Sequence, residues 1–160
     1  MAPFLLPSEP VDSLDAHLAT EVGGRGLARA HEIGPDATAR LVLDAGLRGR
    51  GGAGFPTGRK WLGIAAEDGP TYLVVNAAEG EPGTFKDRAL MRANPYQLVE
   101  GAAVAAFASG VEAVFIAVKG SFDDEQARVV RAVEEMQAAG LVDRPVTVVG
   151  GPDEYLFGEE

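Results

Sequence analysis

Cysteine is absent from this chain of 160 residues, and basic side chains are scarce, with 14 lysines and arginines against 24 aspartates and glutamates. Without cysteine, the chain itself can form no disulfide, thiolate zinc site, cysteine nucleophile or iron–sulfur cluster. The formal charge of −10 argues against a nucleic-acid partner, because such proteins usually carry a basic patch. The length suits one domain with a sizeable core.

Long apolar runs and metal-ligand spacings are also missing. The longest apolar run, residues 102–108, is far shorter than the ~18 residues that indicate a membrane span. The N-terminus has no basic region followed by a long apolar run, so we expect no signal peptide and no direct membrane insertion. His17 and His31 have no partner at a ligand spacing. We expect both histidines to be solvated and the chain to hold no metal.

Alternating helix and strand patterns predict the fold class. We expect residues 1–34, rich in proline and glycine, to form an extended or loosely packed arm. Apolar periodicity then predicts helices at 36–47, 57–67, 85–92, 95–109 and 122–139, and strands at 72–76, 113–118 and 146–149. Such alternation implies βαβ units and a mostly parallel sheet, and continuous apolar strands favour a sheet covered on both faces. Residues 35–160 are therefore predicted to form a Rossmann-like three-layer α/β sandwich.

Three helix starts carry capping signals. Asp36 can cap the first predicted helix. Asn94 followed by Pro95 places a capping residue before a proline at the first helical position. Ser121 with Asp124 fits a capping box.

A glycine-rich basic loop separates the first two predicted helices. Residues 48–60 hold five glycines and four basic side chains. Glycines let several backbone N–H groups approach one anion, and the following helix adds its N-terminal dipole. Residues 49–54 match G-x-G-x-x-G, but a helix precedes them, so this is not a Rossmann fingerprint. A phosphate cradle and a flexible surface loop both remain open, although Phe55, Pro56 and Trp61 favour a cradle beside a flat heterocycle.

A polar loop follows the predicted strand at 72–76 and contains Asn76, Glu79 and Glu81. Ligands of open α/β sheets bind beyond the carboxyl ends of the strands. Asn76 offers a donor and an acceptor to a heterocyclic amide edge, and the glutamates can accept hydrogen bonds from ribose or carboxamide groups. A solvated acidic turn is the simpler explanation of two glutamates taken alone. We expect residues 86–88 to form surface ion pairs that stabilise the fold little.

Three runs of sequence carry a specific resemblance. They read GLRGRGGAGFPTGRKW at 46–61, NAAEGEPGTFKDR at 76–88 and YLFGEE at 155–160. Together and in this order, they resemble motifs of the FMN-binding, NADH-oxidising subunit of respiratory complex I. That family also includes flavin subunits of NAD-linked hydrogenases and formate dehydrogenases.

The resemblance implies FMN as the cofactor and NADH as the substrate, with hydride transfer between them and no catalytic side chain from the protein. It assigns FMN contacts to Gly49, Arg50, Gly51, Gly52, Gly54, Lys60, Asn76, Glu79, Tyr155, Gly158 and Glu159. It assigns NADH contacts to Phe55, Glu81 and Glu160. In this assignment the ring of Phe55 stacks on the adenine.

Three positions depart from the family pattern. Ala78 stands where the family usually has Asp, Gly63 where a second adenine-stacking aromatic is usual, and Phe157 where a cysteine is usual. The family also continues past the third run, into a domain whose cysteines hold a [4Fe–4S] cluster. We therefore expect this chain to be a truncated part of such a protein, inactive by itself, with the cluster only in the missing region.

The resemblance implies the FMN-binding part of an NADH:acceptor oxidoreductase. Such a protein is cytoplasmic, or peripheral at the inner membrane through a complex, and its partners include a thioredoxin-like [2Fe–2S] subunit. Two alternatives stay open: a degenerate or regulatory homologue without catalysis, and an electron-carrier subunit of a membrane ion-pumping complex that shares the glycine loop. The residues before and after that loop favour the first function over the electron carrier.

Overall fold

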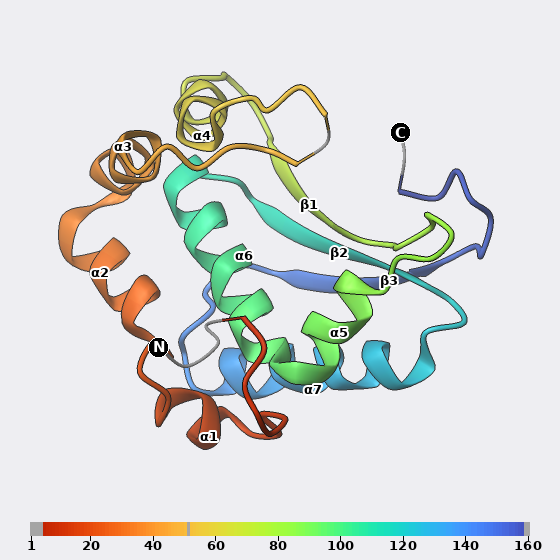
Figure 1. Cartoon of the computed structure of the whole chain (residues 1–160). Helices are drawn as coiled ribbons and strands as arrows, with labels where there is room; N and C mark the ends of the chain where they lie inside the picture. The colour runs from red at the N-terminus through yellow and green to blue at the C-terminus, as the bar shows by residue number, and fades with distance from the viewer. Residues whose placement is uncertain (1–4, 51, 159–160) are drawn as a thin grey trace.

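The computed structural model describes residues 5–50 and 52–158. Its helices are α1 (Leu14–Leu18), α2 (Arg25–Ile33), α3 (Pro35–Asp44), α4 (Thr57–Ala65), α5 (Lys86–Ala93), α6 (Pro95–Ser109) and α7 (Asp123–Ala138). Its strands are β1 (Tyr72–Ala77), β2 (Ala113–Lys119) and β3 (Val146–Gly151), which form one parallel sheet in the order β1-β2-β3 (Figure 1). The predicted α/β class, the parallel sheet and the glycine-rich loop between two helices are confirmed.

Helix α6 is the centre of the helical part, because helices α1 to α5 and α7 and strands β1 and β2 all contact it. Its start follows the predicted signal. The Asn94 side chain accepts a hydrogen bond from Gln97 N, Pro95 is the first helical residue, and Gly110 closes the helix with φ 69°. Small apolar residues on all sides of α6 suit a helix that is surrounded by other elements.

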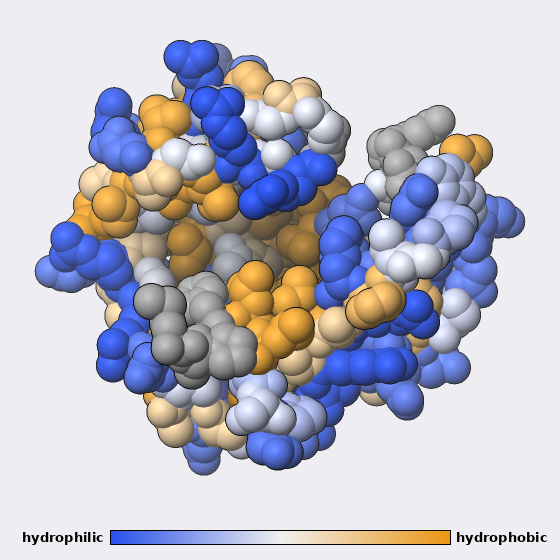
Figure 2. Space-filling view, in the orientation of Figure 1, coloured by the Kyte–Doolittle hydropathy of each residue, from blue (hydrophilic) through white to orange (hydrophobic). Residues whose placement is uncertain are grey.

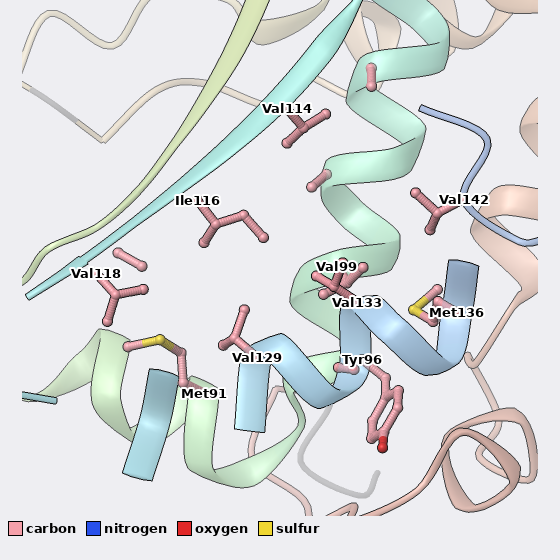
Figure 3. Close-up of a cluster of buried hydrophobic side chains, with 14 of the residues drawn as sticks. Met91, Tyr96, Val99, Val114, Ile116, Val118, Val129, Val133, Met136 and Val142 are labelled. Atoms are coloured by element: carbon pink, nitrogen blue, oxygen red, sulfur yellow. The ribbon is translucent and has the colours of Figure 1, made fainter. Parts of the chain in front are cut away.

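The hydrophobic core lies between β2 and helices α5, α6 and α7 (Figure 3). Val114, Ile116 and Val118 point from β2 toward these helices, and each is at most 1% exposed. They share one buried cluster with Val99 of α6 and Val129 of α7. Alternate residues of β2 therefore anchor the sheet to the helical layer.

The opposite face of the sheet is uncovered in the described part of the chain. Tyr72 and Val74 of β1 are 56% and 65% exposed, and Val149 of β3 is 38% exposed. The expectation that both faces are covered is therefore wrong for residues 5–50 and 52–158. The reason is the strand order: successive right-handed crossovers that add strands in one direction place their helices on the same face.

Two helices, α1 and α2, occupy much of residues 5–34, so the prediction of an extended or loosely packed arm is wrong for these described residues. Helices α1 and α2 contact α6. The expectation that His17 is solvated is also wrong, because its ring is 0% exposed and its Nε2 lies 2.8 Å from Glu100 Oε2. His31 is exposed, as predicted. His17 is buried because the Glu100 carboxylate on α6, distant in sequence, provides it with a polar partner.

Glu100 accepts three hydrogen bonds from α1 and from the start of α2. Besides His17, Gly24 N donates to it at 2.9 Å and Leu27 N at 3.1 Å. Burial by itself raises the pKa of Glu100, but the hydrogen bonds from His17, Gly24 and Leu27 outweigh it, so the pKa lies below its ordinary value. The folded state therefore favours the charged carboxylate.

Two predicted caps are replaced by other contacts. Asp36 lies inside α3 and pairs with Arg40 at 2.7 Å, while Gly34, with φ 86°, takes the cap position. The Ser121 hydroxyl donates to Asp153 at 2.7 Å, and α7 has no side-chain cap. In the second case a tertiary partner competes with the local capping box.

Candidate functional site

The glycine-rich loop is fastened at its base. Arg48 and Pro56 form an antiparallel bridge, and Gly49 N donates to Phe55 O at 2.9 Å. The Arg48 guanidinium also donates to Gly54 O at 3.0 Å. The loop therefore leaves α3 and enters α4 with its two ends tied together, while its basic side chains stay exposed.

At two positions near the tip of the loop, the backbone conformation requires glycine. Gly52 and Gly54 have φ of 93° and 59°, a conformation that side chains rarely adopt. A Cβ at either position would meet nothing within 4 Å, so open space lies beside the loop. Gly58 differs, because a Cβ there would lie 2.3 Å from Ala39 O, so α3 and α4 pack backbone to backbone.

Arg50 lines two pockets. The first has a volume of about 710 Å³ and lies between the loop and the end of α3, lined by Val42, Ala45, Gly46, Leu47, Arg48, Gly49, Arg50 and Gly54. The second, about 380 Å³, brings Arg50 together with Asn76, Ala78, Glu79, Gly80, Glu81, Thr84, Lys86 and Asp87. In the orientation of Figure 1, the surface is hollowed below the loop, with hydrophilic residues above and to the right of the hollow and hydrophobic residues inside and below it (Figure 2).

Asn76 and Glu79 lie in fixed positions beyond the carboxyl end of β1. Asn76 Oδ1 accepts a hydrogen bond from Ala78 N at 3.1 Å. The Glu79 side chain is 2% exposed, accepts from Asp87 N at 3.2 Å, and lies 3.6 Å from Arg88 Nε. Glu79 is thus a buried carboxylate and not part of a solvated turn.

The ion pairs of residues 86–88 divide into two kinds. Lys86 and Asp87 pair at 2.6 Å with the lysine 71% exposed, which is the predicted surface pair. Arg88 does not form a surface pair, because its partner Glu79 is buried. Its guanidinium also lies 5.0 Å from the centre of the Phe122 ring, a cation–π contact. Arg88 therefore links the polar loop to the start of α7, a role that the sequence pattern did not indicate.

The third run packs directly on the second. The Tyr155 hydroxyl donates to Glu81 Oε2 at 2.8 Å, and Asn76 Nδ2 donates to Gly158 O. Gly158 has φ 94°, and a Cβ there would lie 2.8 Å from Asn76 Oδ1. A Cβ at Gly80 would lie 2.9 Å from Tyr155 O. These close approaches require glycine on both sides of the junction.

The structure brings six of the fourteen residues expected at the site to one pocket and its wall. Arg50, Asn76, Glu79 and Glu81 line one pocket, and Tyr155 and Gly158 bind to its wall. Lys60 lies on α4 and Phe55 lies just before this helix, and both are exposed. Neither is among the residues that line the two pockets. Gly51, Glu159 and Glu160 lie outside the described residues.

Three further polar side chains of this pocket were not among the predicted site residues. Thr84, Lys86 and Asp87 line the pocket beside Glu79 and Glu81. All three belong to the run at 76–88, so their place within a motif was the available signal. Their side chains lie there because the loop turns back at residues 81–84, where Thr84 N donates to Glu81 O at 3.2 Å.

Fold and site together define a class of protein: an open parallel α/β sheet with a polar pocket beyond the carboxyl end of a strand, the place where such sheets bind nucleotides. Residues 42–160 match the family of the Nuo51 FMN-binding domain. The chain belongs to this family.

Named relatives agree with the family. An NADH-quinone oxidoreductase subunit of Rhizobium meliloti (strain 1021) is 42% identical over 94% of this chain and 39% of its own length. An NADH-quinone oxidoreductase subunit of Streptomyces coelicolor is 44% identical over 92% of this chain and 35% of its own length. The crystal structure of an NAD+-reducing [NiFe]-hydrogenase in the air-oxidized state superposes with TM-score 0.78 at 36% identity, over 94% of this chain and 26% of that chain.

The chain spans less than two fifths of the length of the curated relatives it matches. Those relatives are named as subunits of NADH-quinone oxidoreductases. Within residues 5–50 and 52–158, no helix has the length and apolar character needed to cross a membrane.

Proposed function

We propose that this chain is the FMN- and NADH-binding part of an NADH:acceptor oxidoreductase, with residues 35–160 as the binding domain. The observation that carries the proposal is the pocket in which Arg50 of the glycine-rich loop meets Asn76, Glu79 and Glu81 beyond the end of β1. A cation from one motif and hydrogen-bonding groups from another suit a ligand that has both a phosphate and a heterocycle.

FMN fits the residues around this pocket. The open space at Gly52 and Gly54 admits a phosphate close to the loop backbone, and Arg50 carries the opposite charge. We propose as FMN contacts Gly49, Arg50, Gly51, Gly52, Gly54, Lys60, Asn76, Glu79, Tyr155, Gly158 and Glu159. Bound FMN would supply a hydride acceptor, while these side chains bind it, orient it and balance its charge.

The NADH contacts are proposed as Phe55, Glu81 and Glu160. Phe55 is 52% exposed, so its ring is accessible for stacking on adenine. The Tyr155 hydroxyl, 2.8 Å from Glu81 Oε2, holds this carboxylate in one orientation. A fixed carboxylate can accept hydrogen bonds from ribose or carboxamide groups without first losing its own freedom.

The partners follow from the same proposal. The natural protein would pass electrons to other subunits, among them a thioredoxin-like [2Fe–2S] subunit, and would carry a [4Fe–4S] cluster outside the present chain. It would lie in the cytoplasm or at the inner membrane surface through its complex. The names of the relatives as subunits support this assembly.

Gly63 favours a second candidate function, a homologue that binds FMN without oxidising NADH. This glycine is exposed on α4, and a Cβ there would meet nothing within 4 Å. An adenine ring would therefore stack on one aromatic wall, that of Phe55, instead of two. Loss of one stacking partner would weaken dinucleotide binding and leave the FMN contacts in place.

One titration separates these functions. FMN is added to the purified chain, and to the longest natural polypeptide that contains it, and flavin fluorescence and the visible spectrum are recorded. NADH is then added without oxygen. Bound flavin that bleaches supports the oxidoreductase, and bound flavin that does not bleach in the longer polypeptide supports the second function. If neither polypeptide binds FMN, both proposals are wrong.

A further inference from the structure

Lys119 is a buried ammonium group beside the site, and it lies outside all three sequence motifs. It is the last residue of the central strand β2 and is 7% exposed. A buried charge needs a polar partner, because its desolvation is costly. The Lys119 Nζ donates a hydrogen bond to the carbonyl oxygen of Asp153 at 3.1 Å.

The same ammonium lies where the second and third motifs meet. A Cβ at Gly80 would lie 3.5 Å from Lys119 Nζ and 2.9 Å from the carbonyl oxygen of Tyr155. Gly80 also lines the pocket that contains Glu79 and Glu81. Lys119 therefore reaches the contact between the second and third motifs from the end of β2.

Residues 153–158 also make hydrogen bonds at exposed positions and one ring contact. The Asp153 carboxylate accepts from Ser121 N and Oγ at 3.1 and 2.7 Å, and Tyr155 donates to Glu81, all at exposed positions. The half-buried Phe157 ring lies against Gly151, where a Cβ would be 2.0 Å from a ring carbon. Hydrogen bonds at exposed positions compete with water. The hydrogen bond from the buried Lys119 ammonium competes with water less, so it restrains the segment more strongly.

We propose that Lys119 is a positioning residue: its ammonium holds the Asp153 carbonyl and so fixes residues 153–158 against the loop of residues 76–81. Tyr155 and Gly158 then reach Glu81 and Asn76 in the geometry of the pocket. The consequence for ligand binding rests on the proposed FMN function, while the fixing of the segment does not.

The first test measures the segment without a ligand. Amide hydrogen exchange of residues 153–158 is compared in the wild-type chain, Lys119→Met, Lys119→Arg and Arg144→Met. Arg144 is the control cation, since it lies before β3 at the other end of the sheet. We expect roughly tenfold faster exchange in K119M, with K119R and R144M close to wild type. Exchange in β3 serves as the internal reference.

The second test measures FMN binding by fluorescence quenching in the same four proteins. We expect K119M to bind FMN about tenfold more weakly, K119R to recover most of the affinity and R144M to match wild type. The thermal midpoint of K119M should not fall, because an apolar residue replaces a buried charge. A purely structural role would instead lower that midpoint and exchange protection throughout the chain.

The outcomes of these two tests support or overturn the proposed role of Lys119. If neither the wild-type chain nor the longest natural polypeptide that contains it binds FMN, the proposed function fails, and hydrogen exchange alone decides the role of Lys119. If K119M exchanges like wild type, or if K119R loosens the segment as much as K119M does, the inference is overturned. If K119M does not fold, Lys119→Gln takes its place, since its shorter amide cannot span the distance to Asp153, and the same exchange criteria apply.

Discussion

Two regions of this molecule, the core around α6 and the loops beyond the carboxyl end of β1, differ in burial and in purpose. Tyr96, Ile116 and Val129 in the core are 0% exposed. Around these loops, Phe55 and Tyr155 are 52% and 50% exposed, and Lys60 of α4 is exposed as well. Burial on the helical side therefore provides most of the free energy of unfolding, while the loops keep polar and aromatic surface available to a ligand.

Substitutions on the two faces of the sheet test whether the helical side provides most of the stability. Ile116→Ala should lower the free energy of unfolding by about 3–4 kcal/mol, because it leaves a cavity in the core. Val74→Ala, on the uncovered face, should change it by no more than about 0.5 kcal/mol. Urea unfolding of both variants measures the difference. Equal losses would mean that the uncovered face is buried in solution.

Glu100→Gln tests the polar part of the core. It removes a charged acceptor of buried hydrogen bonds, and we expect a loss of about 2 kcal/mol at neutral pH. The lowered pKa of Glu100 provides stability that is present above the ordinary value of 4.5 and is lost as the pH falls through the folded-state pKa. The difference in the free energy of unfolding between wild type and E100Q should therefore become smaller below pH 4.5.

Unfolding curves at several pH values measure that gap. The control is Glu112→Gln, since Glu112 is exposed and its substitution should change stability little at any of these pH values. A gap for E100Q that stays constant on acidification would show that Glu100 titrates alike in the folded and unfolded chains.

Gly58→Ala connects the two regions, because α4 carries the end of the glycine-rich loop. The new methyl would lie 2.3 Å from Ala39 O and 2.5 Å from Leu43 N, so α4 must move away from α3. We expect a loss of about 1–3 kcal/mol in chemical unfolding. Gly63→Ala on the same helix has open space and should instead stabilise the chain by about 0.5–1 kcal/mol. Similar effects at both positions would contradict the close packing of α3 on α4.

Lys60→Ala should have the smallest effect on stability and a clear one on binding. Lys60 is exposed, so the free energy of unfolding should change by no more than about 0.5 kcal/mol. FMN affinity should fall roughly tenfold through loss of a charge-assisted contact. Arg29→Ala on α2 removes an exposed cation elsewhere and serves as the control. An FMN affinity in K60A equal to that of wild type would remove Lys60 from the site.

Local signals explain which parts of the fold could be predicted. Asn94, Pro95 and Gly110 act within one turn of the helix they bound, and α6 runs between them as expected. Strand β2 was predictable because its apolar run is continuous. The Ser121 cap failed since its hydroxyl has a partner 32 residues away, which no window of sequence contains.

Long-range contacts explain what could not be predicted. His17 is buried because Glu100, 83 residues further on, lies on the helix against which α1 packs. The uncovered sheet face follows from the strand order, and strand order is a property of the whole chain. The place of Lys119 behind the site has the same origin, because β2 lies between β1 and β3.

The absence of thiol chemistry, the α/β class and the three motifs of the family could all be read from the sequence, since each depends on residue types or on short spacings. Which of these residues meet depends on the tertiary fold. Tyr155 reaches Glu81 across 74 residues, and Arg50 shares a pocket with Asn76. The physical reason is that parallel strands bring distant chain segments to one edge of a sheet, and close packing and hydrogen bonding then select the partners.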